Sequence, residues 1–215
     1  MSSAASRPVH CASLHRRQRP IFFWPRPFRA FWRNIPRFPS ICVSDTLTDI
    51  VAERFDAGIR LGERIERDMI AVRVTDELPI VVAGSPAYFA QRGKPKSPQD
   101  LIAHDCIRIR FSSGTYLPWR FRVKRRDLEV HVKGRLVVNS VTVACRAAVE
   151  GLGLIQGPPM FIATDLAEGR LVTVLDQWAP TPVTGFFLYY PSRRQMRPAL
   201  KALVDFLRDE RPSSS

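Results

Sequence analysis

From residue 41 onward, apolar positions recur at two spacings, every second residue in short runs and every third or fourth residue in longer ones. The first spacing predicts strands and the second predicts amphipathic helices. Strands are expected at 41–43, 57–62, 69–75, 79–83, 106–111, 152–155 and 184–192, with two or three more inside 119–139 and one at the end of 165–175. Helices are expected at 46–55, 86–92, 98–104, 141–151 and 198–210, with a short one after Pro158. Because the two kinds of element alternate throughout, the chain is predicted to be α/β with a mainly parallel or mixed sheet.

Two of these helices are preceded by residues that favour a helix start. Ser85 follows the strand at 79–83 as an N-cap residue, and Pro86 takes the first helical position. Asn139 and Ser140 stand between a strand and a helix in the same way. A serine cap contributes about 1 kcal/mol to stability. A helix N-terminus also presents free N–H groups to an anion, so these positions are candidates for ligand binding as well as for capping.

Composition separates the N-terminal segment from the rest of the chain. The formal charge of the 215 residues is +13, but residues 1–40 hold eight arginines and no acidic residue. The remaining 25 basic and 20 acidic residues are nearly balanced. Six prolines and the lack of any periodicity predict that 1–39 is disordered or poorly packed. An organelle transit peptide and an arm that binds nucleic acid through arginines and aromatic rings are the alternatives.

No residue pattern for catalysis, metal binding or membrane insertion stands out. The cysteines and histidines are scattered, without a C-x-x-C pair, which argues against a zinc site or a disulfide framework and fits a reducing compartment. Paired carboxylates, a nucleophile elbow and a phosphate loop are not recognisable. We therefore expect no enzyme activity, no metal and no cofactor. The lack of an apolar run of roughly 20 residues predicts a soluble, cytoplasmic protein without a membrane partner.

The strands predicted inside 119–139 form a basic hairpin. Its basic residues are Arg120, Arg122, Lys124, Arg125 and Arg126, around a polar turn. Alternation places charged side chains opposite the buried face, so we interpret this hairpin first as a solvated surface.

Five segments, in a fixed order and at characteristic gaps, carry a resemblance to a known family. They are DIVAERFDAGIRLGE (49–63), VVAGSPAYFAQRGKPKSPQDLIAHDCI (81–107), GRLVVNSVTVACRAAVEGLGL (134–154), LAEGRLVTVL (166–175) and LYYPSRRQ (188–195). Between Ser44 and Arg208 the sequence resembles the effector-binding domain of LysR-type transcriptional regulators. The resemblance implies a fold like the type 2 periplasmic binding proteins, in which two Rossmann-like subdomains are joined by crossing strands and a small effector lies in the cleft between them.

Mapped on this sequence, the resemblance implies a first subdomain at 40–77 plus 176–212 and a second at 78–175. It implies a ligand-binding role for three residues at helix N-termini, Ser85, Asn139 and Ser140. Arg60, at the end of the strand AGIR, is placed in the cleft, where its guanidinium could pair with a carboxylate; a plain surface arginine is the alternative. The implied partners are a small anionic effector such as a carboxylate and further copies of the chain. Closure or rotation of the two halves would then alter a DNA-bound oligomer.

The sequence also departs from the family. A winged helix-turn-helix, a linker helix and the first βα unit of the effector domain are not recognisable before Ser40, so no DNA-binding residue is identified. We expect DNA as a partner only if a helix-turn-helix is present in the intact protein. Residues 1–40 are interpreted as an unrelated replacement or a reading-frame accident. The function expected is that of an effector-binding domain of a transcription regulator; a stand-alone small-molecule-binding protein and a non-functional or interfering fragment are the alternatives.

Overall fold

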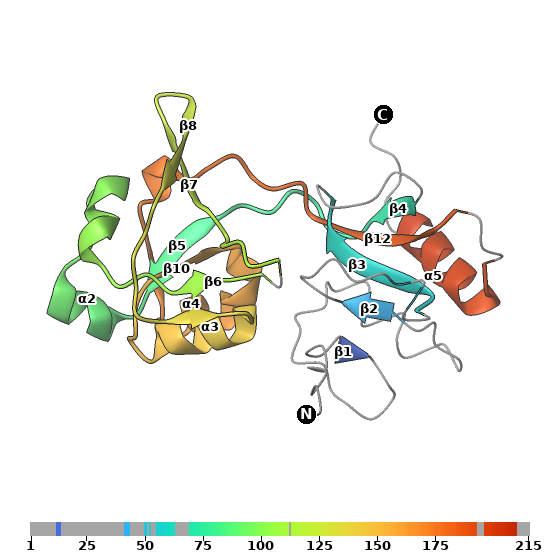
Figure 1. Ribbon diagram of the computed structural model, residues 1–215, viewed down its shortest axis with the longest axis horizontal. Helices are drawn as coiled ribbons and strands as arrows, with labels where there is room; N and C mark the ends of the chain where they lie inside the picture. The colour runs from blue at the N-terminus through green and yellow to red at the C-terminus, as the bar shows by residue number, and fades with distance from the viewer. Residues whose placement is uncertain are drawn as a thin grey trace, which may run out of the picture. The chain divides into compact units, whose positions relative to one another are not determined.

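A computed structural model describes residues 12–13, 41–43, 50, 52, 55–62, 69–111, 113–192 and 196–209. The chain divides into two compact units, Met1–Asp76 with Gly185–Ser215 and Glu77–Thr184 (Figure 1). Residues 176–184, which the family resemblance assigns to the first subdomain, lie in the second unit. The reason is local, because η4 (Asp176–Trp178) brings Trp178 against the apolar cluster of that unit.

The first unit is a sheet covered by the C-terminal helix. Its strands are β1 (Ala12–Ser13), β2 (Ile41–Val43), β3 (Ala57–Leu61), β4 (Met69–Arg73) and β12 (Phe186–Pro191). They lie in the order β1-β2-β3-β12-β4, in which only β2 and β3 pair in parallel. Helix α5 (Pro198–Asp209) buries the predicted stripe of Leu200, Leu203, Val204 and Leu207 against alternate residues of β3, β4 and β12. The helix predicted at 46–55 lies largely outside the described residues, as does 1–40 apart from Ala12–Ser13, which pair with β2.

The second unit has a mixed sheet. Its strands are β5 (Val81–Gly84), β6 (Arg108–Ile109), β9 (Val137–Val138), β10 (Ile155–Gly157) and β11 (Val172–Val174). Strand β5 runs antiparallel to β10 on one side and to β11 on the other. Strand β6 runs parallel to β9, and a parallel bridge between Cys106 and Leu154 places it beside β10. This arrangement is the mixed sheet predicted from the alternation of elements.

Helices cover both faces of this sheet. Helices α3 (Val141–Val149) and α4 (Ala163–Ala167) lie on the face of Ile107, Ile109 and Ile155. Helix α2 (Pro86–Arg92) and the 3₁₀ helix η2 (Pro98–Ala103) pack on the opposite face, beside the hairpin of β7 (Trp119–Val123) and β8 (Arg126–Val130). The helix expected at 98–104 is therefore a 3₁₀ helix, and the short helix after Pro158 is η3 (Pro159–Phe161).

Candidate functional site

Three strands of the second unit end at one edge of its sheet. Because β6, β9 and β10 run in the same direction, Arg110, Asn139 and Gly157 lie at or just beyond their carboxyl ends. We call these three positions the carboxyl edge. In open α/β sheets the carboxyl ends of strands are where ligands bind. The carboxyl edge is therefore the place in this unit where a ligand site is expected.

Helix α3 begins at this edge. Ser140 is its N-cap residue, and the Ser140 carbonyl accepts the first helical hydrogen bond from Ala144 N at 3.1 Å. The Ser140 hydroxyl makes no cap hydrogen bond, so the predicted side-chain cap is wrong at this position. Asn139 is exposed and Ser140 is half-buried. The first-turn N–H groups of α3 are left without a side-chain cap from this residue, and they carry the positive end of the helix dipole.

Arg108 and Arg110, which the sequence places on the strand 106–111, alternate with Ile107 and Ile109 and so point to the face of the sheet opposite α3. The Tyr116 ring lies beside them. Arg108 pairs with Val137 in the β6–β9 ladder, and Arg110 N donates to Val138 O at 2.7 Å. The guanidinium carbons of Arg108 and Arg110 lie 4.6 and 6.0 Å from the centre of the Tyr116 ring. The Arg108 Nε atom is buried without a hydrogen-bond partner among the described residues. The alternation in CIRIRF was the available signal, since it places both arginines on one face.

Ser85 lies at the opposite edge of the sheet. Because β5 runs antiparallel to β10, its carboxyl end, which Ser85 follows, lies where β10 begins. The Ser85 hydroxyl also lies beside Gly151, beyond the C-terminal end of α3, while Ser140 stands at the N-terminal end of that helix. A helix of this length spans roughly 13 Å. The structure therefore brings Asn139 and Ser140 together but does not bring Ser85 to them.

The predicted cap role of Ser85 is confirmed. Its hydroxyl accepts a hydrogen bond from Tyr88 N at 3.2 Å, and its side chain is only 3% exposed. Pro86 occupies the first turn of α2, and Gly93 follows the helix with a φ of 73°. Burial and this hydrogen bond account for a serine at the position without any ligand.

In the first unit, Arg60 is 6% exposed and engaged by an aromatic side chain. Its guanidinium carbon lies 4.1 Å from the centre of the Tyr189 ring, and Nη2 donates to the Tyr189 hydroxyl. The surface-arginine alternative is therefore wrong. Gly58 makes this stack possible, because a Cβ at that position would lie 2.3 Å from Tyr189 Cζ.

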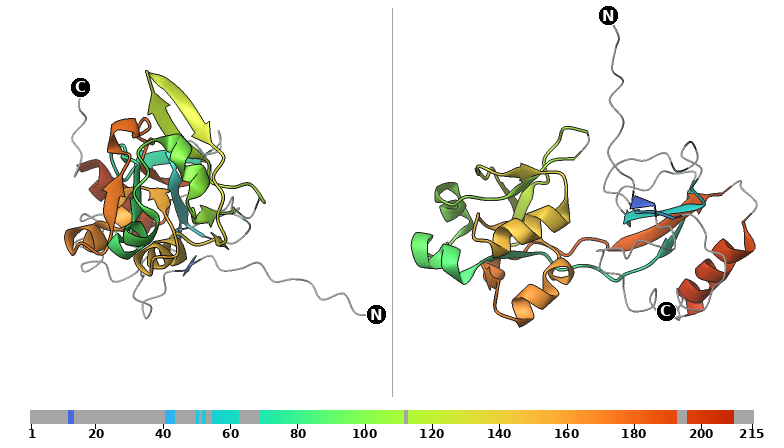
Figure 2. Two further views of the ribbon diagram at one scale, coloured as in Figure 1. Left: turned by 90° about the vertical axis from the view of Figure 1, so that its left-hand side faces the viewer. Right: turned by 90° about the horizontal axis from the view of Figure 1, so that it is seen from below.

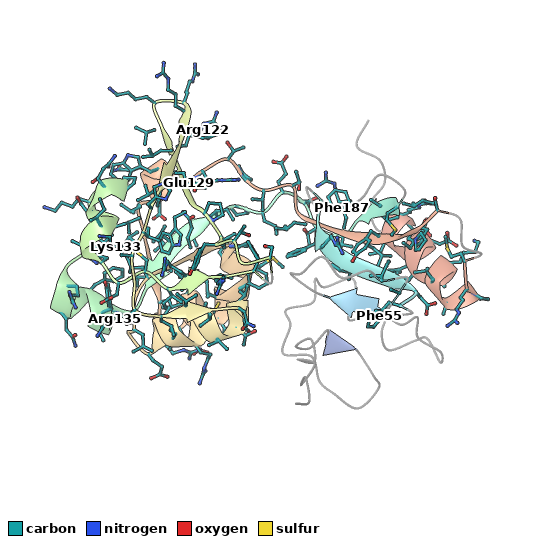
Figure 3. The ribbon with its side chains drawn as sticks, in the orientation of Figure 1. Phe55, Arg122, Glu129, Lys133, Arg135 and Phe187 are labelled. Atoms are coloured by element: carbon teal, nitrogen blue, oxygen red, sulfur yellow. The ribbon has the colours of Figure 1, made fainter. Side chains whose placement is uncertain are left out.

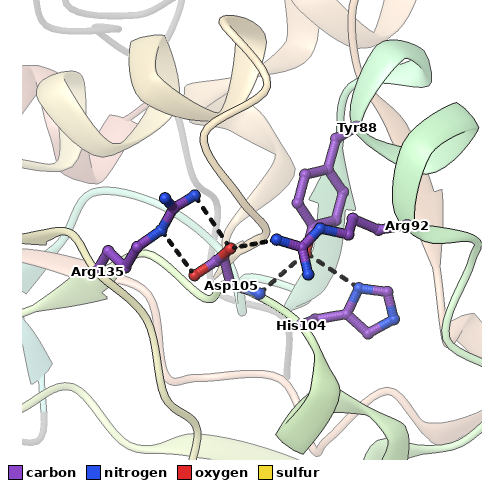
Figure 4. Close-up of polar contacts among 5 residues, drawn as sticks. All are labelled: Tyr88, Arg92, His104, Asp105 and Arg135. Atoms are coloured by element: carbon purple, nitrogen blue, oxygen red, sulfur yellow. Dashed lines mark hydrogen bonds and ion pairs between the residues drawn. The ribbon is translucent and has the colours of Figure 1, made fainter.

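A second polar cluster joins α2 to η2 and the segment before β9 (Figure 4). Asp105 pairs with Arg92 at 3.5 Å and with Arg135 at 3.3 Å. The Tyr88 hydroxyl accepts from Asp105 N at 2.9 Å and lies 3.1 Å from His104 Nδ1. Burial lowers the pKa of His104 from 6.5, although Asp100 opposes the shift. Burial likewise raises the pKa of Tyr88. The neutral forms of both rings are therefore favoured at pH 7.

Chemistry other than ligand binding finds little support in the described residues. Burial, with a smaller effect from Asp105, raises the pKa of Cys106 to about 12, and burial raises that of Cys145 to about 11. Neither thiol supplies a nucleophilic thiolate at neutral pH. In the part of the chain that the structure describes, no group of three or more His, Cys, Asp or Glu side chains could hold a metal ion. No helix in that part is long and apolar enough to span a bilayer.

Comparison with known proteins gives a consistent picture. Residues 39–212 match the LysR substrate binding domain. A Pseudomonas aeruginosa protein named as a transcriptional regulator is 47% identical over 165 residues, which cover 76% of this chain and 54% of that protein. The HTH-type transcriptional regulator PgrR of Escherichia coli is 36% identical over 182 residues, covering 84% of this chain and 60% of PgrR. The chain thus spans between half and two thirds of the length of these relatives.

Solved structures agree in fold. The regulatory domain of CrgA, a LysR-type transcriptional regulator from Neisseria meningitidis, superimposes with a TM-score of 0.67 at 23% identity, covering 78% of this chain and 80% of that domain. The regulatory domain of AphB from Vibrio vulnificus gives a TM-score of 0.61 at 21% identity, covering 74% and 77% of the two chains. The predicted periplasmic-binding-protein-like fold is confirmed by these neighbours.

Proposed function

Because the chain belongs to the LysR substrate-binding domain family, we propose that it is the effector-binding part of a regulator of DNA-templated transcription. The names of its relatives support the regulatory role, and the family supports a small-molecule effector rather than a reaction. Homo-oligomer formation through this domain is part of the same proposal.

The effector is proposed to be a small anion, such as a carboxylate, held at the carboxyl edge. The observation that carries this is the start of α3, where Ser140 does not cap its helix and Arg110 stands on the neighbouring strand. N–H groups at a helix N-terminus and a guanidinium both favour negative charge. Asn139 and Ser140 would supply hydrogen bonds, and Arg108 and Arg110 would supply charge.

Arg60 and Ser85 take different places in this proposal. Arg60 is proposed to meet the ligand from the first unit, in the cleft that the family resemblance implies, with its guanidinium already oriented by Tyr189. An arginine held in one position loses less entropy on pairing with a carboxylate. We propose that Ser85 caps α2 and does not contact this ligand, which supports a purely structural role for its hydroxyl.

A thermal-shift screen of small mono- and dicarboxylates, each beside its neutral amide, tests the proposal. At least one carboxylate is expected to raise the melting temperature saturably, and its amide is expected not to. Ser140→Ala should weaken binding of that carboxylate by about 10- to 100-fold, which corresponds to one hydrogen bond to a charged group. Ser85→Ala is the matched control, because it removes the same hydroxyl from the opposite edge. Equal shifts from acid and amide, or equal losses in the two variants, would contradict the assignment.

A further inference from the structure

The β7–β8 hairpin is fixed to the second unit by its inner face. Trp119 and Phe121 are buried, and Leu128 and Val130 pack against the same apolar cluster. The Gln156 amide ties the stem down further, because its Oε1 accepts from Arg120 N at 2.9 Å and its Nε2 donates to Arg120 O at 2.8 Å. The outer end of the hairpin extends away from the body of the unit in Figure 1 and in the left-hand view of Figure 2. The stem is therefore anchored and the tip is presented to solvent.

Charge along the outer face is balanced in the stem and unbalanced at the tip. Arg120 lies opposite Glu129 and Arg122 opposite Asp127 in the antiparallel register. Opposite charges at such positions attract one another. The three residues at the tip have no acidic residue opposite them: Lys124, Arg125 and Arg126. All three are exposed, and none forms an ion pair with a described residue. Figure 3 shows the side chains of the tip directed outward.

The backbone at the tip is strained for the residues that occupy it. Val123 pairs with Arg126, so Lys124 and Arg125 alone form the turn, with φ angles of 48° and 67°. A two-residue turn with both φ angles positive is formed most readily by Asn-Gly, because in the left-handed region a Cβ atom comes too close to the backbone carbonyl oxygen, and only Gly and, to a lesser degree, Asn adopt that region readily. Folding alone would favour Asn-Gly here. Strain retained at an exposed position motivates a functional explanation.

We propose that this tip, Lys124 to Arg126, is a contact for the phosphate backbone of nucleic acid. Protein interfaces are built around apolar or aromatic anchors with few charges at their centre. The tip offers no such anchor, since the apolar residues of the hairpin are turned into the cluster below. Three exposed cations at the end of an anchored hairpin match a repeating polyanion instead, which needs charge without shape complementarity. This inference goes beyond effector binding and concerns a different face of the second unit from the carboxyl edge.

Binding of the full chain to a fluorescent DNA duplex of arbitrary sequence, measured over a series of salt concentrations, tests the inference. The variant Lys124→Asn/Arg125→Gly removes two charges and installs the turn sequence that the backbone prefers. Its melting temperature should rise. The slope of log K against log salt, which is negative, should decrease in magnitude by about two, and the affinity at 0.1 M salt should decrease by roughly ten- to a hundredfold. Lys94→Gln/Lys96→Gln is the control, because both lysines are exposed and the change in net charge is the same. The arginines of residues 1–40 remain in both variants, so any binding that they contribute cancels in the comparison.

Each outcome separates the tip from general charge. A loss confined to the hairpin variant supports the proposal. No binding by the parent chain, no change in the hairpin variant, or equal losses in both variants overturns it. The hairpin variant could instead bind DNA unchanged but lose self-association in sedimentation. That result would assign the tip to contact with a second copy of the chain and would also overturn the proposal. The carboxylate shift, measured on the same three proteins, reports on the proposed effector site separately, so either claim can fail without the other.

Discussion

Gly58 must lack a side chain because the Tyr189 ring lies against it. A Cβ at Gly58 would lie 2.3 Å from Tyr189 Cζ, so the ring that orients Arg60 cannot keep its place over a larger residue. Gly58→Ala is expected to lower the free energy of unfolding by about 1–3 kcal/mol, the usual cost of overpacking. Gly157→Ala is the matched control, because a Cβ there meets no atom within 4 Å. Denaturant unfolding of both variants measures the difference; equal effects would mean that the close approach of the ring is not what the glycine serves.

The side-chain amide of Gln156 makes two hydrogen bonds to the backbone of Arg120, as a neighbouring strand would. Gln156→Met keeps the length of the side chain but leaves the Arg120 N–H and carbonyl without their partners. The expected loss in the free energy of unfolding is about 1–3 kcal/mol. Faster hydrogen exchange at the Arg120 amide should accompany the loss. Unchanged exchange at that amide would show that the hairpin is held by its apolar face alone.

At the scale of single residues, the sequence predicted which residues stand at helix starts better than it predicted the contacts that their side chains make. Ser85 was predicted as a cap and is one, because a short Ser-Pro start leaves few alternatives for its hydroxyl. Ser140 occupies the same position on α3, but its hydroxyl does not turn to the helix. The stacking of Arg60 on Tyr189 joins residues 129 positions apart and could not be read from local pattern.

The contact between α2 and the end of η2, made by Tyr88 and His104, should make stability depend on pH. The folded pKa of His104 lies below its ordinary value of 6.5, chiefly because the ring is partly buried. The unfolded chain therefore binds a proton more readily than the folded chain does. The stability that the neutral His104 ring contributes is complete above pH 6.5, and it is lost as the pH falls from 6.5 through the folded pKa.

Denaturant midpoints at pH 7.5, 6.5 and 5.5 test this expectation. The parent chain should lose more stability across that range than His104→Gln, whose amide does not titrate. His131→Gln is a suitable control, since His131 is exposed and lies on the segment after β8. Identical pH profiles for the parent chain and His104→Gln would contradict the role given to His104.

At the scale of elements, most strands and helices were predicted with their type, and the exceptions have local causes. The segment 98–104 is a 3₁₀ helix, in which Ser97 and Asp100 form a capping box over six residues. The segment 106–111 forms a ladder only at Arg108–Ile109, where it pairs with β9, while Cys106 and Arg110 make single bridges to Leu154 and Tyr116. Periodicity reports which residues are buried, and it does not report how many ladder bonds a neighbour can offer.

For the molecule as a whole, the second unit is continuous in sequence and should fold by itself. Residues 77–184 contain two apolar clusters of their own, and their first and last segments pair through Leu78 and Val183 with bonds of 2.9 and 3.0 Å. A fragment of 77–184 is expected to unfold cooperatively in denaturant. The first unit is formed from two separate stretches, so 1–76 alone should show no such transition. A fragment of 77–184 without a cooperative transition would contradict the division.

For the candidate site, the sequence did not predict which of the candidate residues lie at the same edge of the sheet. The family resemblance and the alternation of elements both pointed to helix N-termini that follow strands, and three such residues were chosen. Which of them share an edge depends on strand direction, because antiparallel β5 carries Ser85 to the edge opposite Ser140. Pairing direction is set by contacts between distant segments. Local pattern therefore could not separate the ligand candidates at the carboxyl edge from the structural cap.

Hydrogen exchange of the backbone amides, with and without a carboxylate that raises the melting temperature, tests the central claim most directly. An anion held at the carboxyl edge should slow exchange in the first turn of α3 and in the segment around Arg110, where its hydrogen bonds are made. Exchange in the first turn of α2, beyond Ser85, should stay unchanged. Protection that instead appears at α2 and is absent from α3 would contradict a ligand site at the carboxyl edge.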